Sequence, residues 1–416
     1  MDDVIGWNGE ALATRAPRNQ VSDLRGVSRL AVDATTGITG LVEAMHLGIA
    51  RVPAKLGGPL VEGAVTGMAW PVYRSIHGVT RALGGGIDLL LARLAPMLGH
   101  VDSSPAREAA IAALNGVLGD HLTETGNPLA ITMHWRKDGK PLALTREALA
   151  AAFPMASAKI VVLVHGLCMN DLQWTRQEHN HGAALARNLG YTPVYLHYNS
   201  GQHVSTNGRA LTAMLDALVA AWPVPVEELA IVAHSMGGLV ARSAHHYGTV
   251  AGHAWRRHLR KLVFLGTPHH GAALERGGHR LHRLVDRTPF MAPLASLGKI
   301  RSAGITDLRH GSLLDEDWHG RDRFAHAEDA RRPVPLPEGV ACFAIGATTA
   351  SAPSDPRARL LGDGLVPLAS ALGRHRDPER TLPLPDAHQW IVCGASHFDL
   401  LSRAQVYERI HAWLAG

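Results

Sequence analysis

Cysteine, aromatic side chains and charge are all scarce in this 416-residue chain. It has three cysteines, and aromatic residues make up 5% of the sequence. The cysteines, Cys168, Cys342 and Cys393, are odd in number and lie far apart, so they do not indicate a disulfide framework and fit a reducing compartment. With 46% hydrophobic and 19% charged residues, the chain can build a substantial core without covalent links.

Dense basic runs and long apolar runs are also missing. The formal net charge of +5 is spread over the chain, which argues against a nucleic-acid partner and leaves only weak attraction to anionic membranes. The acidic start Met1–Gly6 lacks the basic and apolar pattern of a secretory signal. No uncharged apolar run approaches the ~18–20 residues of a membrane span. We therefore expect a cytoplasmic location, with peripheral membrane contact as the alternative.

Apolar residues recur at three- and four-residue steps in residues 24–118. The pattern predicts four helices with few charges, the last of them opening at Pro105 and running to about Leu118. We expect residues 1–121 to form an N-terminal helical region. Its apolar surface has two interpretations: it docks on the rest of the protein, or it meets lipid or a second copy of the chain.

Strands and helices alternate from residue 122 onward. Ile160–Val164 is a continuous β-branched run, typical of a strand buried on both faces, and an Asp138-Gly139 turn predicts a β-hairpin before it. The alternation predicts an α/β fold, a mostly parallel sheet with helices on both faces, in residues 122–416. It fails at about 272–337, where we expect a helical cap insertion.

A small-x-Ser-x-Gly turn stands at the centre of this region. Ser235 follows the apolar strand Leu229–Ala233 and precedes a helical segment, the context in which a serine becomes a nucleophile. Ala233 and Gly237 supply the small neighbours that such a tight turn requires. The bland alternative is a strand–helix turn whose serine caps the helix.

A serine hydroxyl needs a base, and the base needs a carboxylate to orient it. Asp363 lies in a glycine-flanked loop and His397 follows a late strand, so nucleophile, acid and base come in the chain order of this fold. Asp399, two residues from His397, and Asp386 are weaker candidates for the acid.

The reaction also needs N–H donors for an oxyanion. The backbone N–H of Met236, directly after the nucleophile, is one candidate, and Leu167, in the His165-Gly166-Leu167 turn after an early strand, is the other. Cys168 follows this turn, and we interpret it as a small packing residue because no histidine is paired with it in the sequence.

These motifs together resemble the α/β-hydrolase serine esterases and lipases, above all bacterial triacylglycerol-lipase-like and GPI-inositol-deacylase-like enzymes. The similar stretches are His165-Gly166, Ala233–Gly238, Gly266–Gly271 and Gly362–Gly364, and the resemblance covers roughly residues 122–416. It implies Ser235, Asp363 and His397 as the triad, with Leu167 and Met236 as oxyanion donors.

We therefore expect a serine carboxylic-ester hydrolase that forms an acyl-enzyme on a small hydrophobic ester, without a cofactor. The expected substrate-binding residues are Leu167, His269, His270, Leu365 and Val366. Some similar lipases carry a structural zinc, but His279, His282 and His319 show no tight ligand spacing, so no metal is expected. A thioesterase, a polyester depolymerase, an acyltransferase and a non-catalytic binding protein remain alternatives.

Overall fold

The computed structural model describes residues 26, 29, 105–272, 301–323, 329–352 and 362–416. Apart from residues 26 and 29 and its last helix, the four-helix pattern predicted for residues 24–118 lies outside the described residues. Much of the predicted cap, residues 273–300 and 324–328, lies outside them as well.

The chain packs as two units. The larger comprises residues 104–125 and 130–416, and the smaller comprises residues 1–103 and 126–129. Helix α3 (Pro105–Glu124) starts at the predicted proline and packs with the larger unit, so the boundary expected at residue 121 falls inside this helix. We call the larger unit the hydrolase unit.

An eight-stranded sheet forms the centre of the hydrolase unit, in the order β2-β1-β4-β3-β5-β6-β7-β8. Strands β3 to β8 run parallel, and β1 pairs antiparallel with β4 and with β2. The strands are β1 (His134–Lys137), β2 (Lys140–Pro141), β3 (Lys159–Val164), β4 (Thr192–His197), β5 (Glu228–His234), β6 (Leu259–Leu265), β7 (Ala341–Thr348) and β8 (Gln389–Cys393).

The predicted central strand and the predicted edge hairpin are both confirmed. Ile160–Val164 is fully buried, because neighbouring strands pair with both edges of β3 and helices cover both faces. Between β1 and β2, Asp138 and Gly139 adopt φ values of 50° and 75°, the left-handed pair that a two-residue hairpin turn requires. The sequence pattern therefore located both the central strand and the edge hairpin.

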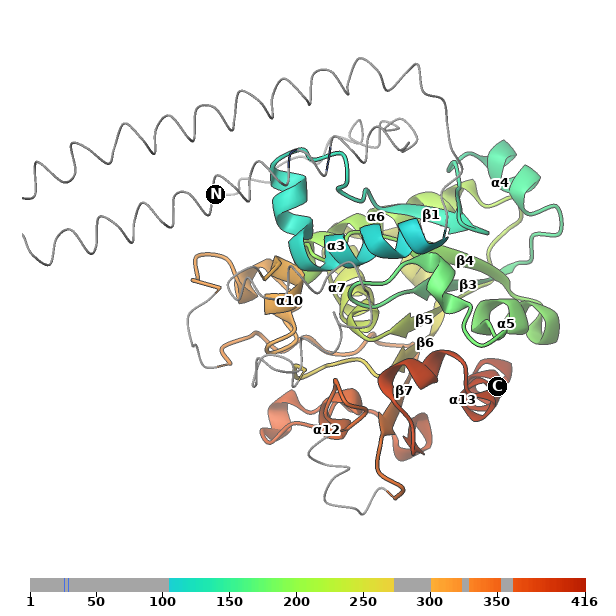
Figure 1. The fold of residues 1–416 in the computed structure, drawn as a ribbon. Helices are drawn as coiled ribbons and strands as arrows, with labels where there is room; N and C mark the ends of the chain where they lie inside the picture. Colours follow the sequence, from blue (N-terminus) through green and yellow to red (C-terminus); the bar gives the residue numbers. More distant parts are fainter. Residues whose placement is uncertain (1–25, 27–28, 30–104, 273–300, 324–328, 353–361) are drawn as a thin grey trace, which may run out of the picture. The chain divides into compact units, whose positions relative to one another are not determined.

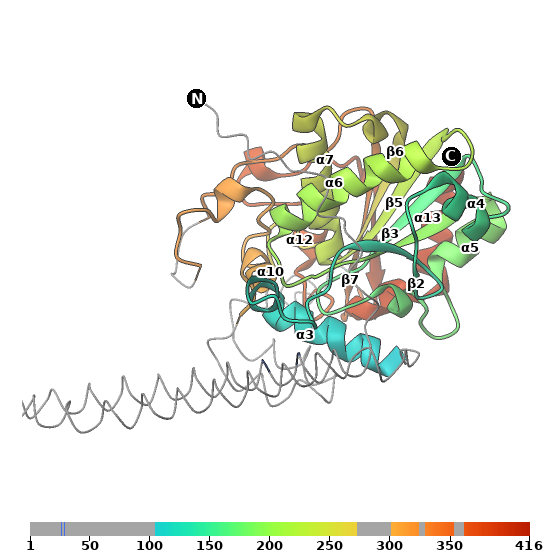
Figure 2. The same cartoon turned by 90° about the horizontal axis from the view of Figure 1, so that it is seen from above.

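Helices cover the two faces of the sheet (Figures 1 and 2). Besides α3, the helices are α4 (Arg146–Ala152), α5 (His181–Leu189), α6 (Val204–Ala221), α7 (Met236–Ala251), α10 (Ala303–Asp307), α12 (Leu368–Ala371) and α13 (Ala404–Ala415). On one face of the sheet α5 packs beside α13, and on the other α6 packs beside α7. None of the described helices combines the length and the apolar character that a membrane span needs.

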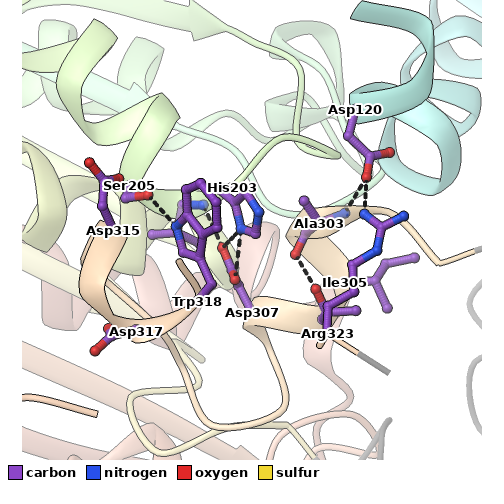
Figure 3. Close-up of polar contacts among 12 residues, drawn as sticks. Asp120, His203, Ser205, Ala303, Ile305, Asp307, Asp315, Asp317, Trp318 and Arg323 are labelled. Atoms are coloured by element: carbon purple, nitrogen blue, oxygen red, sulfur yellow. Dashed lines mark hydrogen bonds and ion pairs between the residues drawn. The ribbon is translucent and has the colours of Figure 1, made fainter. Parts of the chain in front are cut away.

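The described part of the insertion is anchored on α3 and α6 by polar contacts (Figure 3). Asp307 accepts hydrogen bonds from the Val204 N–H at 2.7 Å and from His203 Nδ1 at 3.1 Å. The His203 ring stacks on Trp318 with centroids 3.7 Å apart, and Trp318 Nε1 donates to Ser205 Oγ at 2.9 Å. These contacts hold residues 301–323 over the start of α6.

The carboxyl ends of β3, β5, β6, β7 and β8 meet at one edge of the sheet because these strands are parallel. Ligand sites of open parallel sheets lie at this edge. The strand order, the antiparallel β1 and the serine turn after β5 together make an α/β-hydrolase fold, as the sequence resemblance implied.

Candidate active site

Ser235 occupies a sharp turn between β5 and α7. Its φ of 54° and ψ of −127° are strained for a residue with a side chain, and strain of this kind persists where the surroundings enforce it. The Ser235 N–H donates to the Leu265 carbonyl at 2.8 Å. A Cβ at Gly237 would lie 2.4 Å from the Val164 carbonyl oxygen, so this neighbour must be glycine. The tight turn thus fixes the position of Ser235 between β5 and α7.

Asp363 and His397 come together 34 residues apart in sequence. Asp363 Oδ2 lies 2.6 Å from His397 Nδ1, and both side chains are buried. The other carboxylate oxygen, Oδ1, accepts from the Leu365 N–H at 3.0 Å and the Val366 N–H at 2.8 Å. Because the carboxylate accepts at Nδ1, that nitrogen carries the proton and Nε2 is left as the base.

Neither of the two alternative acids pairs with His397. Asp399 Oδ2 accepts the Ser396 N–H at 2.8 Å and caps the short helical turn that starts at His397. Asp386 is exposed in a separate turn before β8. Asp363 is therefore the carboxylate that the fold gives to His397.

Two residues that position His397 escaped the sequence reasoning. Gly266 has a φ of 60°, and a Cβ there would lie 3.1 Å from His397 Nδ1 and Cε1, so glycine lets the imidazole pack closely. His234 Nε2 donates to the His397 carbonyl at 3.2 Å; burial, and then the charge of His397, hold the pKa of His234 well below its usual range. Gly266 stood in a recognised motif, but His234 gave no signal beyond its place beside Ser235.

The two expected oxyanion donors flank Ser235. Met236 begins α7, so its N–H has no partner in the preceding turn, and Leu167 lies in the turn after β3. Neither N–H donates to another group of the described residues. A Cβ at Gly166 would lie 2.9 Å from Ser235 Cβ, so glycine brings the Leu167 turn close to the serine.

A small cavity of about 20 Å³ opens at Ser235 and His397. Leu167, Leu365 and Val366, three of the residues predicted to bind substrate, lie in its wall. The wall also contains Met169, Leu308 and Phe398, which the sequence reasoning did not name; Leu308 reaches the cavity from the insertion.

His269 and His270 lie elsewhere than expected. They line a second cavity of about 200 Å³, while their neighbour Pro268 lines the cavity at Ser235. The reason is a turn in which the Gly271 N–H donates to the Pro268 carbonyl at 3.1 Å, with Gly271 at a φ of 89°. The turn carries the two histidines away from the serine.

Cys168 has the environment of a packing residue. Its Sγ lies 3.7 Å from the Ala113 carbonyl, and burial raises the pKa of the thiol to about 12, so no thiolate forms at neutral pH. All three cysteines are unpaired. Among the described residues, no group of three or more His, Cys, Asp or Glu side chains could hold a metal ion.

The strand order and the serine turn place this unit among proteins of the α/β-hydrolase fold. More narrowly, residues 156–333 match the family model of the PGAP1-like alpha/beta domain. This match spans β3 to β6, Ser235 and most of the insertion expected at about 272–337; it ends before Asp363 and His397.

Solved structures similar to the chain include three hydrolases of low identity. The mature lipase BlEst2 of Bacillus licheniformis is 18% identical over 68% of this chain and 97% of its own, with a TM-score of 0.40. The phospholipase PlaB of Legionella pneumophila is 18% identical over 62% of this chain and 59% of its own, with a TM-score of 0.39. The esterase Pf2001 of Pyrococcus furiosus is 14% identical over 62% of this chain and 81% of its own, with a TM-score of 0.37. No curated protein sequence matches the chain.

Proposed function

We propose that the protein is a serine carboxylic-ester hydrolase, an esterase or lipase that works through Ser235, His397 and Asp363. The observation that carries the proposal is the 2.6 Å contact between Asp363 Oδ2 and His397 Nδ1 beside a serine in strained backbone geometry. The chain order serine, aspartate, histidine is the one that this fold uses.

In the proposed reaction His397 Nε2 takes the hydroxyl proton of Ser235 while Oγ attacks the ester carbonyl carbon. The N–H groups of Leu167 and Met236 stabilise the oxyanion, and one such donor contributes about 2.7–4 kcal/mol to the transition state. His397 then protonates the leaving alcohol. A water molecule, deprotonated by the same nitrogen, releases the acid from Ser235. Asp363 keeps the ring in the required tautomer.

The apolar wall of the small cavity supports a hydrophobic acyl ester as the substrate. Leu167, Met169 and Leu308 lie in it with Val366 and Phe398, and none of these side chains is charged. A thioester, a polyester or an acyl acceptor other than water would use the same residues, so a thioesterase, a depolymerase and an acyltransferase are the alternatives. A hydrolase-fold binding protein without activity is the alternative outside enzymes.

Hydrolysis of p-nitrophenyl esters of increasing acyl length, by the wild type and Ser235→Ala, tests the proposal. We expect activity that rises with acyl length and falls by about 10⁴-fold or more in the variant. Activity confined to short chains would replace the lipid-like substrate by a small ester. Equal rates for the two proteins would contradict the catalytic role of Ser235.

The cytoplasmic location, and membrane contact or self-association through the N-terminal segment, are further proposals. Co-sedimentation of the full chain with liposomes tests the membrane contact, and its molar mass in solution tests the self-association. A chain that stays monomeric and stays in the supernatant contradicts both the membrane contact and the self-association.

A further inference from the structure

The second cavity holds a buried positive charge without a counter-ion. Arg242, on α7 two turns after Ser235, is 4% exposed and lines this cavity. Its Nη2 donates to the Val334 carbonyl at 2.5 Å and its Nη1 lies 3.3 Å from His269 Nδ1. Its Nε has no hydrogen-bond partner, and no carboxylate of the described residues forms an ion pair with it. A buried charge without a partner is costly, so this arrangement calls for an anion.

The charge of Arg242 is retained at neutral pH. Burial, and after it the charge of Arg331, lower the pKa of Arg242 only to about 10. Arg331 and Arg380, which also line the cavity, do not share this situation, because both pair with Asp329, at 2.8 and 3.2 Å. Among the described residues that line this cavity, Arg242 is therefore a buried cation that no carboxylate compensates.

His269 adds a second unpartnered donor. Burial and the nearby Arg242 hold the pKa of His269 well below its usual range, so the ring is neutral. Its Nδ1 accepts from Arg242, which leaves the proton on Nε2. This Nε2 is buried and has no hydrogen-bond partner among the described residues.

His270 supplies an acceptor in the same wall. Its Nε2 donates to the Gly373 carbonyl at 3.0 Å, and burial lowers the pKa of the ring to about 4. The neutral ring therefore presents an unprotonated Nδ1, which has no partner. The neighbouring Arg332 is exposed, and its guanidinium forms no ion pair or hydrogen bond with the described residues.

Two carboxylates also line the cavity, and they set a limit on the ligand. Asp317 is saturated by the N–H groups of Leu313, Leu314 and Arg332, at 2.8, 3.0 and 3.2 Å. Glu379 is exposed, and its carboxylate makes no ion pair within the described residues. The anion therefore binds at the Arg242 end of the cavity, away from the carboxylates of Asp317 and Glu379.

We propose that this cavity is a phosphate-binding site, in which Arg242, His269 and Arg332 donate to a phosphate group and His270 accepts from its hydroxyl. Three donor groups from three segments match the several oxygens of a tetrahedral phosphate better than the two of a planar carboxylate, and a protonated phosphate oxygen matches the acceptor. The phosphate belongs to a small soluble molecule or to a lipid headgroup, since both present the same group.

The site adjoins the proposed catalytic centre through one loop. Pro268 lines the cavity at Ser235, and the next two residues line the phosphate cavity. The same loop starts at Gly266, against which His397 packs. A phosphate bound at His269 therefore holds the loop that supports the base.

Isothermal titration of the full-length Ser235→Ala protein with inorganic phosphate, at constant ionic strength, tests the site without relying on hydrolysis. We expect saturable binding at one site per chain, weakened about tenfold by Arg242→Lys, which keeps the charge but loses Nε and the planar fork. Arg332→Gln, at an exposed side chain, weakens it several-fold. Arg260→Gln removes an exposed arginine outside the cavity and leaves binding unchanged.

Three results would overturn the phosphate site, and a vesicle experiment distinguishes the two sources of the phosphate. Absence of saturable phosphate binding, equal affinity in Arg332→Gln and its Arg260→Gln control, or acetate binding as tight as phosphate binding would each overturn the proposal. Vesicles of phosphatidylcholine doped with phosphatidic acid then distinguish the two sources. Co-sedimentation that inorganic phosphate displaces and Arg332→Gln weakens indicates a lipid headgroup; phosphate binding without co-sedimentation indicates a small soluble phosphate.

Discussion

The two cavities of the hydrolase unit differ in whether their polar groups have internal hydrogen-bond partners. At Ser235, both oxygens of Asp363 accept hydrogen bonds and the His397 ring is held on Nδ1. In the other cavity, Arg242 Nε and His269 Nε2 are buried and have no hydrogen-bond partner in the described part of the chain. Groups that transfer protons gain from internal partners that fix their orientation, whereas groups that bind a ligand must keep donors free for it.

Asp363→Asn gives the largest expected effect on this comparison. The asparagine side chain can turn its NH₂ group toward His397 Nδ1. This nitrogen then accepts instead of donating, so the ring takes the wrong tautomer and kcat falls by about 10⁴-fold. Phosphate binding stays unchanged, because Asp363 does not line that cavity. Ester kinetics and titration of the same protein measure both; an asparagine variant with nearly wild-type kcat would remove Asp363 from the mechanism.

Gly266→Ala should have the next largest effect. The added methyl would lie 3.1 Å from His397 Nδ1 and Cε1 at a φ of 60°, which displaces the ring. A misplacement of this size costs about 10²-fold in rate. Gly252→Ala is the matched control, because Gly252 has a φ of 69° but nothing within 4 Å of the added methyl. It shares the backbone cost without touching the site, so equal loss of kcat in both variants would contradict a positioning role.

Sequence order alone predicted most of the fold and supplied the candidates for the proposed triad. Buried β-branched runs specify strands, and the positions of Ser235, Asp363 and His397 after the parallel strands β5, β7 and β8 place them at one sheet edge. The α/β-hydrolase fold was predicted and is confirmed. The supports of the site were not predictable in this way, because the approach of Gly266 to His397 depends on the register between β6 and β8 through β7.

The second cavity shows where such reasoning ends. Arg242 is one of 41 Lys and Arg residues, and nothing in its local sequence marks it as buried. His269 and His270 were expected beside the substrate, but one turn at Pro268–Gly271 sends them to another cavity. A local pattern gives the side chain and its element; the direction that a loop takes after a strand depends on its tertiary contacts.

Asp329→Asn should sharpen the comparison at the phosphate cavity. The Asp329 carboxylate holds Arg331 through two contacts of 2.8 Å and Arg380 at 3.2 Å. The neutral amide removes the counter-charge of both guanidinium groups, although Arg331 still donates to the His269 and Gly311 carbonyls. Phosphate affinity should therefore rise several-fold, since hydrogen bonds to a charged donor are the stronger ones. Titration with inorganic phosphate measures this. Weaker phosphate binding in a folded variant would mean that the Asp329 pairs build the site rather than compete with it.

Asp329→Asn should also change how the free energy of unfolding depends on pH in the acid range. Burial acts to raise the pKa of Asp329, but the hydrogen bond and charge of Arg331, helped by Arg380, outweigh it and hold the pKa below its usual range. A carboxylate with a lowered pKa stabilises the fold above its unfolded pKa of about 3.9, and this contribution is lost as the pH falls below that value. Urea unfolding at pH 7 should show a loss of about 1 kcal/mol or less, since the group is partly exposed, and the difference from wild type should shrink below pH 4.

Trp318→Phe should have the smallest effect, because it alters the support of both cavities without touching either set of proposed ligands. The variant keeps an aromatic ring against His203 but loses the hydrogen bond from Nε1 to Ser205 Oγ, worth about 0.5–1.5 kcal/mol. The insertion contributes Leu308 to one cavity and Leu313 to the other, so a loosened anchor would reach both. We expect a lower urea midpoint, with ester hydrolysis and phosphate affinity each within about twofold of wild type, because Asp307 still fixes the insertion to the Val204 N–H. A tenfold loss at one cavity alone would show that the Trp318 contact sets the geometry of that cavity, which would assign to the insertion a part in one site and not the other.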